Sequence, residues 1–154
     1  MPLLKNDYRK LYNFQDLFLE QWCNLDLPFY LTGGTALGRF YLNHRYSDDL
    51  DFFINNSDKF KQYIQYIRDF IKQNFNTHND HLLITDDYAR FFVHLDNQIL
   101  KIEFINDVEY YVGSSEEIYF GYIDTPVNIL SNKLNTLISR DEPKDVYDII
   151  MIAL

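Results

Sequence analysis

The residues between 29 and 54 constrain the fold of this chain more than any other stretch. They begin with the apolar run FYL, which predicts a short buried strand. Gly33 and Gly34 end that run, and a helical pattern follows from 35 to 41. A second strand, DLDFFI, is predicted at 49–54. The sequence therefore predicts a strand, a glycine turn, a helix and a second strand in direct succession.

The glycine turn has the features of a phosphate-binding site. Free backbone N–H groups and the positive end of the dipole meet at the start of a helix, and glycine lets a ligand approach the backbone closely. We expect Gly33 and Gly34 to contact the β- and γ-phosphates of a nucleotide, with Thr35 contributing its hydroxyl. The alternative is a tight turn without a ligand.

Two acidic residues alternate with apolar ones in the second strand. Asp49 and Asp51 point to one face, roughly 6–7 Å apart along the strand. Leu50, Phe52 and Ile54 point to the opposite face, toward a core. Neighbouring carboxylates stay ionised readily only where a cation lies between them, and oxygen ligands of this kind favour Mg²⁺ or Mn²⁺. We expect a metal site here, and the alternative is a solvated, charged edge strand.

A strand with the same division of polarity is predicted at 99–105. Its apolar residues share one face, while Lys101 and Glu103 share the other. Glu103 thus repeats the arrangement of the two aspartates. Its alternative role is an ion pair with Lys101 or with a basic residue on the next strand.

Two separate motifs resemble a known family. GGTAL at 33–37 and HRYSDDLD at 44–51 resemble the opening motif of the AbiEii/AbiGii-type nucleotidyltransferase toxins, of the DNA polymerase β-like nucleotidyltransferase superfamily. NKLNTLISR at 132–140 and PKDVYD at 143–148 resemble its later motif. The resemblance implies an α+β, polymerase β-like nucleotidyltransferase fold, with a mixed or antiparallel sheet packed with helices. We expect a single domain over 1–154, without the accessory helices that longer relatives have.

The resemblance also implies roles for acidic and basic residues. Asp49 and Asp51 bind Mg²⁺ or Mn²⁺ in this interpretation, and Glu103 is the third carboxylate of the metal site. Lys133 corresponds to a lysine that faces the nucleotide phosphates, and Asp145 to an essential acid that orients it. The alternatives are structural: Lys133 extends from a helix edge to water, and Asp145 stabilises a helix N-terminus.

Arg45 and Ser47 immediately precede the paired acids. A guanidinium at this place is able to reach a triphosphate, so both residues are candidates for nucleotide binding. The alternative is that they only hold the loop in place, with Arg45 paired to Asp48.

The implied reaction is metal-dependent transfer of a nucleoside monophosphate from an NTP to an acceptor hydroxyl. The family suggests a toxin of a toxin–antitoxin or phage-defence system, with tRNA as one acceptor and a cognate antitoxin as a protein partner. Two alternatives remain. One is modification of a protein or of a small molecule, as in antibiotic nucleotidyltransferases; the other is a catalytically silent nucleotide-binding or scaffold domain.

Composition limits the partners and the compartment. The formal net charge of −9 argues against a broad nucleic-acid surface, so we expect no DNA partner, and an RNA acceptor would need a local basic patch. The apolar runs are far shorter than the roughly 20 residues of a membrane span. The only cysteine, Cys23, lies in a helical apolar pattern, where we expect a core residue. These features fit a cytoplasmic protein.

Periodicity and turn residues place the remaining elements. We expect helices at 8–25, 58–75, 126–139 and from 143 onward, and strands at 81–85, 90–95 and 117–123. The helix at 58–75 has an apolar stripe that packs on the sheet, formed by Phe60, Ile64, Ile67, Ile71 and Phe75. The apolar face expected for the helix at 126–139 consists of Leu130, Leu134, Leu137 and Ile138.

Overall fold

The computed structural model describes residues 5–77, 81–137, 139 and 142–154. Strands and helices alternate in no simple repeat. The strands are β1 (Tyr30–Thr32), β2 (Leu50–Asn55), β3 (Asn76–Thr77), β4 (Leu83–Ile84), β5 (Tyr88–Leu95), β6 (Gln98–Asp107), β7 (Glu116–Ile118) and β8 (Gly121–Ile123). The helices are α1 (Lys5–Trp22), α2 (Gly33–Thr35), α3 (Phe60–Asn74), α4 (Pro126–Thr136) and α5 (Pro143–Ala153), with the short 3-10 helix η1 (Cys23–Leu25) and the π-helix η2 (Ala36–Leu42), which continues α2.

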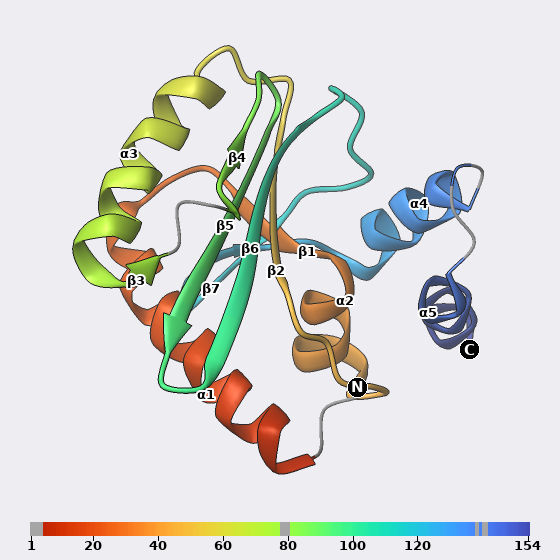
Figure 1. Ribbon diagram of the computed structural model, residues 1–154. Helices are drawn as coiled ribbons and strands as arrows, with labels where there is room; N and C mark the ends of the chain where they lie inside the picture. Colours follow the sequence, from red (N-terminus) through yellow and green to blue (C-terminus); the bar gives the residue numbers. More distant parts are fainter. Residues whose placement is uncertain (1–4, 78–80, 138, 140–141) are drawn as a thin grey trace.

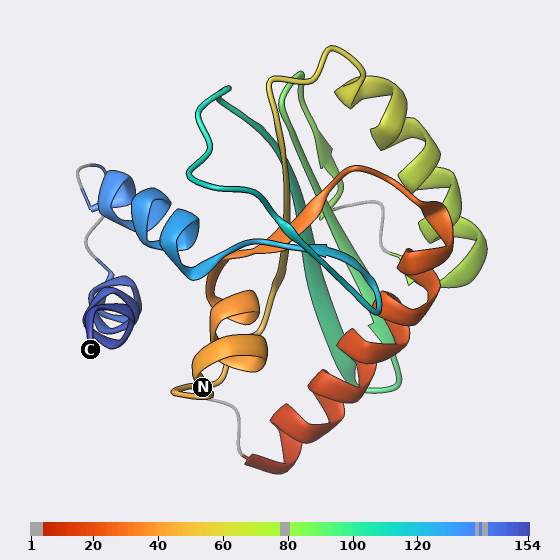
Figure 2. The same cartoon turned by 180° about the vertical axis from the view of Figure 1, so that it is seen from behind.

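The strands form one mixed sheet in the order β3-β5-β6-β2-β1-β8-β7, with β4 paired to β5. The central strand β2 runs antiparallel to β1 and parallel to β6, and β1 runs parallel to β8. Helices α1 and α3 cover one face, whereas α4 and α5 lie beyond the opposite face (Figures 1 and 2). This arrangement confirms the predicted α+β fold with a mixed sheet.

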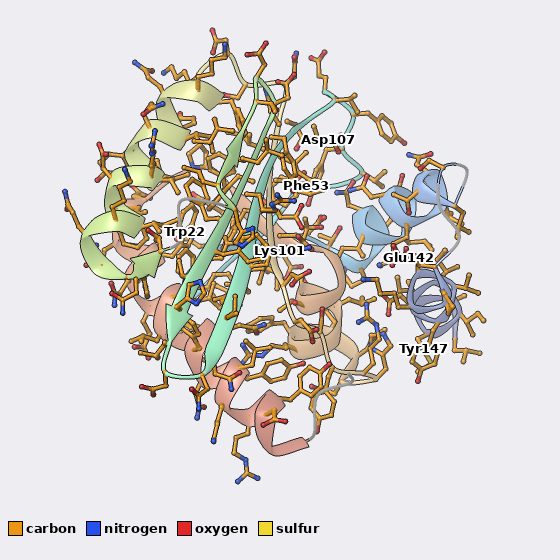
Figure 3. The ribbon with its side chains drawn as sticks, viewed as in Figure 1. Trp22, Phe53, Lys101, Asp107, Glu142 and Tyr147 are labelled. Carbon is orange, nitrogen blue, oxygen red and sulfur yellow. The ribbon has the colours of Figure 1, made fainter. Side chains whose placement is uncertain are left out.

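The core lies between the sheet and the helices α1 and α3. Strand β2 buries every second residue, starting with Leu50, because side chains alternate between the two faces of a strand. Trp22 packs on Phe52 with ring centroids 4.6 Å apart and on Phe104 at 5.5 Å. Figure 3 shows Trp22 on the α3 side of the sheet and Phe53 on the side toward α4. The polar face of β2 is therefore free to form a site.

The stripe predicted for the helix at 58–75 is confirmed in α3. Phe60, Ile64, Ile67 and Ile71 are all buried, at the spacing of a helix face that packs on a sheet. Burial of each such side chain stabilises the fold by roughly 1.5–3 kcal/mol.

Two elements predicted for the second half of the chain differ from the structure. The expected strand at 117–123 is a hairpin of β7 and β8, because Gly121 takes a positive φ of 131° that interrupts the extended backbone. Helix α4 ends at Thr136, earlier than predicted, and Leu134, expected on its apolar face, is 48% exposed. Ile138, also predicted on that face, lies outside the described residues. The buried face of α4 instead includes Lys133.

The first helix also differs from the prediction at its end. α1 stops at Trp22, and the chain passes through the short turn η1 before reaching β1. Cys23 begins this turn and is exposed, so the expectation of a core cysteine was wrong. Its helical spacing no longer applies because the α-helix has already ended.

A buried carboxylate fixes α4 to the sheet. Asp124, which follows β8, accepts hydrogen bonds from the Thr32 hydroxyl at 2.6 Å, the Tyr111 hydroxyl at 2.6 Å and the Asn128 amide at 3.0 Å. Thr125 then caps the helix by accepting a hydrogen bond from the backbone N–H of Asn128. The start of α4 is thus held beside the end of β1, which sets the position of the residues farther along the helix.

Candidate active site

Three acidic side chains lie on the polar face of the two neighbouring strands β2 and β6. Asp51 is directly opposite Glu103 in the parallel register, and Asp49 precedes Asp51 by two residues. The ammonium nitrogen of Lys101 lies 3.2 Å from Asp49 Oδ2 and 3.0 Å from Glu103 Oε1 (Figure 3 labels Lys101). The Tyr88 hydroxyl donates to Glu103 Oε2 at 2.6 Å. We call Asp49, Asp51 and Glu103 the acid cluster.

The acid cluster favours an added positive charge. Burial, followed by the negative charges of Glu103 and Asp49, raises the pKa of Asp51 to about 7. Burial also raises the pKa of Asp49, although the Lys101 ammonium acts in the opposite direction. Ionisation of Asp49 and Asp51 together is therefore unfavourable until another cation approaches them.

The glycine turn lies against both the acid cluster and the loop before β2. Gly33 has a φ of +73°, and a Cβ added there would lie 2.8 Å from Asp51 Oδ2. A Cβ on Gly34 would lie 2.4 Å from an Arg45 guanidinium nitrogen and 3.0 Å from Ser47 Oγ. A side chain at either position would displace the acid or the guanidinium from the turn, and at Gly33 the positive φ also favours glycine.

Buried polar residues hold the loop that leads into β2. Thr35 is fully buried, and its hydroxyl donates to the Asp49 carbonyl and lies 2.9 Å from Ser47 Oγ. Gln15 of α1, also fully buried, donates to the Asp48 carbonyl at 3.0 Å. Thr35 thus positions the loop, while its expected contact with phosphate stays a prediction.

A second charged group joins α4 and α5 to the same loop. Lys133 is only 8% exposed, and its ammonium lies 2.9 Å from both Asp145 Oδ1 and Asp148 Oδ2. Arg45 donates two hydrogen bonds of 2.7 Å to the two carboxylate oxygens of Asp148, which His44 also contacts. Burial alone would raise the pKa of Asp148, but hydrogen bonds from these three basic side chains hold it well below its usual range. We call these five residues the helix network.

The helix network contains expected and unexpected members. Asp145 lies beside Lys133, as the resemblance implied, but Arg45 pairs with Asp148 and not with Asp48. The sequence did not single out Asp148 or His44 as site residues. A signal existed for Asp148, since it follows Asp145 by three residues and therefore lies one helical turn farther along the same side of α5.

Two adjoining clefts of about 380 and 360 Å³ open on this surface. They share Gly33, Asp49, Asp51, Lys133 and Lys144. The first also contains Gly34, Arg45 and Ser47 and is lined mainly by polar groups, and we call it the phosphate cleft after the ligand that we propose for it. The second cleft adds Lys101 and Glu103 and the apolar residues Phe53, Ile105 and Ile129. Every residue predicted for the site except the buried Thr35 therefore lines at least one of the clefts.

The acid cluster forms only part of a site for a divalent metal. Among the described residues, no group of three or more His, Cys, Asp or Glu side chains is arranged to hold a metal by itself. The Lys101 ammonium lies between Asp49 and Glu103 instead. Mg²⁺ commonly takes one or two carboxylates and completes its shell with water and substrate phosphates. Asp49 and Asp51 beside the glycine turn fit such a partial site, and the ammonium shows that the place accepts a cation.

Comparison with protein families identifies a match over most of the chain. Residues 17–154 match the family described as nucleotidyl transferase AbiEii toxin, type IV toxin–antitoxin system. Both glycine-turn and helix-network residues lie within the matched range. Among curated protein sequences, none is significantly similar to this chain.

Several solved structures share the fold. JHP933 from Helicobacter pylori superposes with a TM-score of 0.67 and 24% identity, over 99% of this chain and 68% of that chain. ANT(2")-Ia in complex with adenylyl-2"-tobramycin has a TM-score of 0.59 and 15% identity, over 94% and 88% of the two chains. The Megavirus polyadenylate synthase has a TM-score of 0.52 and 12% identity, over 99% of this chain and 33% of that one. Across the described part of the present chain, no helix is both long and apolar enough to cross a bilayer.

Proposed function

Since the chain belongs to the AbiEii family of nucleotidyl transferase toxins, we propose that it transfers a nucleoside monophosphate from an NTP to an acceptor hydroxyl in a reaction that depends on Mg²⁺ or Mn²⁺. The observation that carries this proposal is the contact between the glycine turn and the acid cluster. Gly33 leaves space for Asp51 Oδ2 at the same point where backbone N–H groups begin the helix. A phosphate bound at the glycine turn would therefore lie beside the Asp51 carboxylate.

The phosphate cleft supplies positive charge for the leaving end of the nucleotide. Gly33 and Gly34 offer backbone donors, and Arg45 and Lys133 contribute fixed cations that the helix network holds in place. Ser47 adds a hydroxyl at the wall of the cleft. Because these groups are positioned before substrate arrives, little reorganisation is needed as charge develops on pyrophosphate.

The acid cluster acts at the α-phosphorus and at the acceptor hydroxyl. A divalent cation bound by Asp49 and Asp51, with Glu103 as a third carboxylate, would neutralise phosphate charge and lower the pKa of the acceptor hydroxyl. The acceptor oxygen forms a bond to the α-phosphorus, the α–β bridging P–O bond breaks, and pyrophosphate leaves. The hydroxyl proton passes to a carboxylate of the cluster, and the second cleft gives the acceptor access to it.

The acceptor we propose is tRNA, and the partner that controls the enzyme is a cognate antitoxin protein, as the toxin–antitoxin family suggests. A small-molecule acceptor is the second candidate. It is favoured by the net charge of −9, which disfavours an extended RNA surface. The fold shared with ANT(2")-Ia shows that this architecture also occurs in a protein solved with an adenylylated aminoglycoside.

The test is to incubate the protein with each α-³²P-labelled NTP, Mg²⁺ and either total tRNA, a cell lysate or an aminoglycoside panel. We expect label to appear on tRNA with the native protein and to be absent with Asp51→Asn. Label on protein or on an aminoglycoside would replace the tRNA assignment with that acceptor. If label never leaves the NTP with any of these acceptors, while each NTP still binds in a titration, the scaffold alternative is supported.

A further inference from the structure

We propose that Lys101 is an internal cation of the acid cluster, which bridges Asp49 and Glu103 in the metal-free protein and is displaced when a divalent cation binds. The inference rests on the proposed function, because it concerns the metal-binding step of that reaction. It assigns to Lys101 the role of setting the affinity of the site for metal.

The strand register places the lysine where a metal would bind. Leu50 lies opposite Ile102 and Asp51 lies opposite Glu103 in the parallel pair of β2 and β6. One step back on the same polar face, Lys101 meets Asp49, and its ammonium also reaches Glu103 at 3.0 Å. The lysine therefore connects acids from two strands within the second cleft.

The surroundings of Glu103 direct it toward Lys101. The Tyr88 hydroxyl donates to Oε2 at 2.6 Å, so the other oxygen, Oε1, is the one that contacts the ammonium. The side chains of Lys101 and Asp49 are 33% and 34% exposed, and that of Glu103 is 18% exposed. Water and small ions consequently have access to the bridge.

A divalent cation and the ammonium compete for the same oxygens. Two positive charges within about 4 Å of each other repel strongly at the low effective dielectric of a partly buried site. The lysine is the group that moves, because its charge lies at the end of a flexible four-carbon chain and is readily hydrated. The bridge relieves the repulsion among the acids before the metal arrives. It weakens metal binding because this favourable interaction is lost when the metal displaces the ammonium.

Binding of Mn²⁺ alone tests the inference without any turnover. Free Mn²⁺ would be measured by electron paramagnetic resonance during titration of the native protein, Lys101→Met and Lys101→Arg. We expect Lys101→Met to bind Mn²⁺ roughly tenfold more tightly, because a competing charge is gone. Lys101→Arg keeps the charge and should remain close to the native affinity. The metal-free melting temperature should fall in Lys101→Met, and saturating Mn²⁺ should raise it more than in the native protein.

Lys144→Met is the matched control for charge. Lys144 lines both clefts, but its ammonium pairs with Glu142 at 3.3 Å and acts on Asp51 only as a weaker charge, behind Lys101. Removal of this charge should change Mn²⁺ affinity by less than about threefold, since exposed charges are screened. An equally large effect of Lys144→Met would show that any nearby positive charge weakens Mn²⁺ binding, and it would overturn the proposal.

A measurement on the native protein covers the case in which Lys101→Met does not fold. In protein labelled with [¹³Cε]lysine, the Lys101 signal is identified by its absence in Lys101→Arg. Titration with diamagnetic Mg²⁺ should shift this signal in step with metal binding. Native Mn²⁺ binding with an unmoved Lys101 signal, or equal affinity in Lys101→Met, overturns the internal-cation role and leaves the proposed function intact. Absence of Mn²⁺ binding in both proteins, with NTP present as well as without it, overturns the metal dependence too.

Discussion

The acid cluster and the helix network surround aspartate side chains with opposite charges. On β2 and β6, the carboxylates meet one another and the Lys101 ammonium. Between α4 and α5, Asp148 alone is contacted by three basic side chains. The pKa of Asp51 is accordingly raised to about 7, whereas that of Asp148 is held well below its usual range.

This difference separates a binding surface from its support. A cluster with excess negative charge gains stability from a cation that arrives with substrate, so it is suited to catalysis. A carboxylate that is already saturated by internal donors gains nothing from a ligand. Asp148 instead holds Arg45 and Lys133 at the edge of the phosphate cleft, and in the proposed reaction it is a positioning residue that acts through them.

The largest expected effect comes from breaking the acid cluster. Asp51→Asn should lower the rate of label transfer about a thousandfold, which corresponds to roughly 4 kcal/mol of transition-state stabilisation. Its melting temperature without metal should be equal to or higher than that of the native protein, because a repelling charge is removed. Initial rates and thermal unfolding measure the two effects.

Asp86→Asn is the control for this substitution. Asp86 forms an exposed ion pair with Lys61 of α3, and loss of its charge should leave both rate and melting temperature unchanged. An Asp51→Asn protein that keeps more than about a tenth of the native rate would contradict the assigned role of the acid cluster.

The next largest effect should come from breaking the helix network. Asp148→Ala leaves a buried lysine and a partly buried arginine without their shared carboxylate, which should lower the free energy of unfolding by about 3 kcal/mol. Urea unfolding followed by circular dichroism measures the change. A loss below about 1 kcal/mol would mean that the helix network does not support the fold.

Acidification should reveal the same carboxylate. Since the pKa of Asp148 is lower in the folded protein, the unfolded chain binds its proton first, so stability present above about pH 4 is lost as the pH falls. Between pH 5 and 2, the native protein should lose on the order of 2 kcal/mol more than Asp148→Asn. Urea midpoints across this range provide the comparison, and parallel curves would exclude the predicted contribution.

The smallest effect concerns the glycine turn, which touches the acid cluster. Gly33→Ala strains a backbone with φ of +73° and pushes against Asp51 Oδ2, so we expect a loss of about 2 kcal/mol. Gly113→Ala is the matched control, because Gly113 has a similar φ of +82° and nothing within 4 Å of an added Cβ. It should lose only about 1 kcal/mol. Equal losses in urea unfolding would show that contact with Asp51 is unimportant.

Local periodicity was sufficient to predict the faces of the two charged strands. Asp51 lies on the polar side of β2, with Asp49 directly before the strand, and Lys101 and Glu103 lie on the polar side of β6, because alternation depends only on neighbouring residues. The mixed sheet that aligns them was implied by the family resemblance and is confirmed by the structure. Strand pairing itself depends on contacts between distant residues, which periodicity does not contain.

The helix network could not be predicted in the same way. Its central contact joins Arg45 to Asp148, 103 positions apart, and no local pattern relates the two. The apolar stripe assigned to α4 placed Leu134 inward, whereas the structure buries Lys133 against acidic partners on α5. The orientation of this helix is set by charge pairing and by the Asp124 anchor, so hydrophobic spacing alone was misleading.

The long separation between Arg45 and Asp148 has a consequence during translation. A ribosome completes the glycine turn well before it reaches α5, and until then the growing chain lacks the carboxylate that holds the Arg45 guanidinium. The acidic partners of Lys133, which are Asp145 and Asp148, are likewise added to the chain after it. A growing chain therefore cannot complete the helix network, and with it the fixed position of both cations, until α5 has emerged and docked.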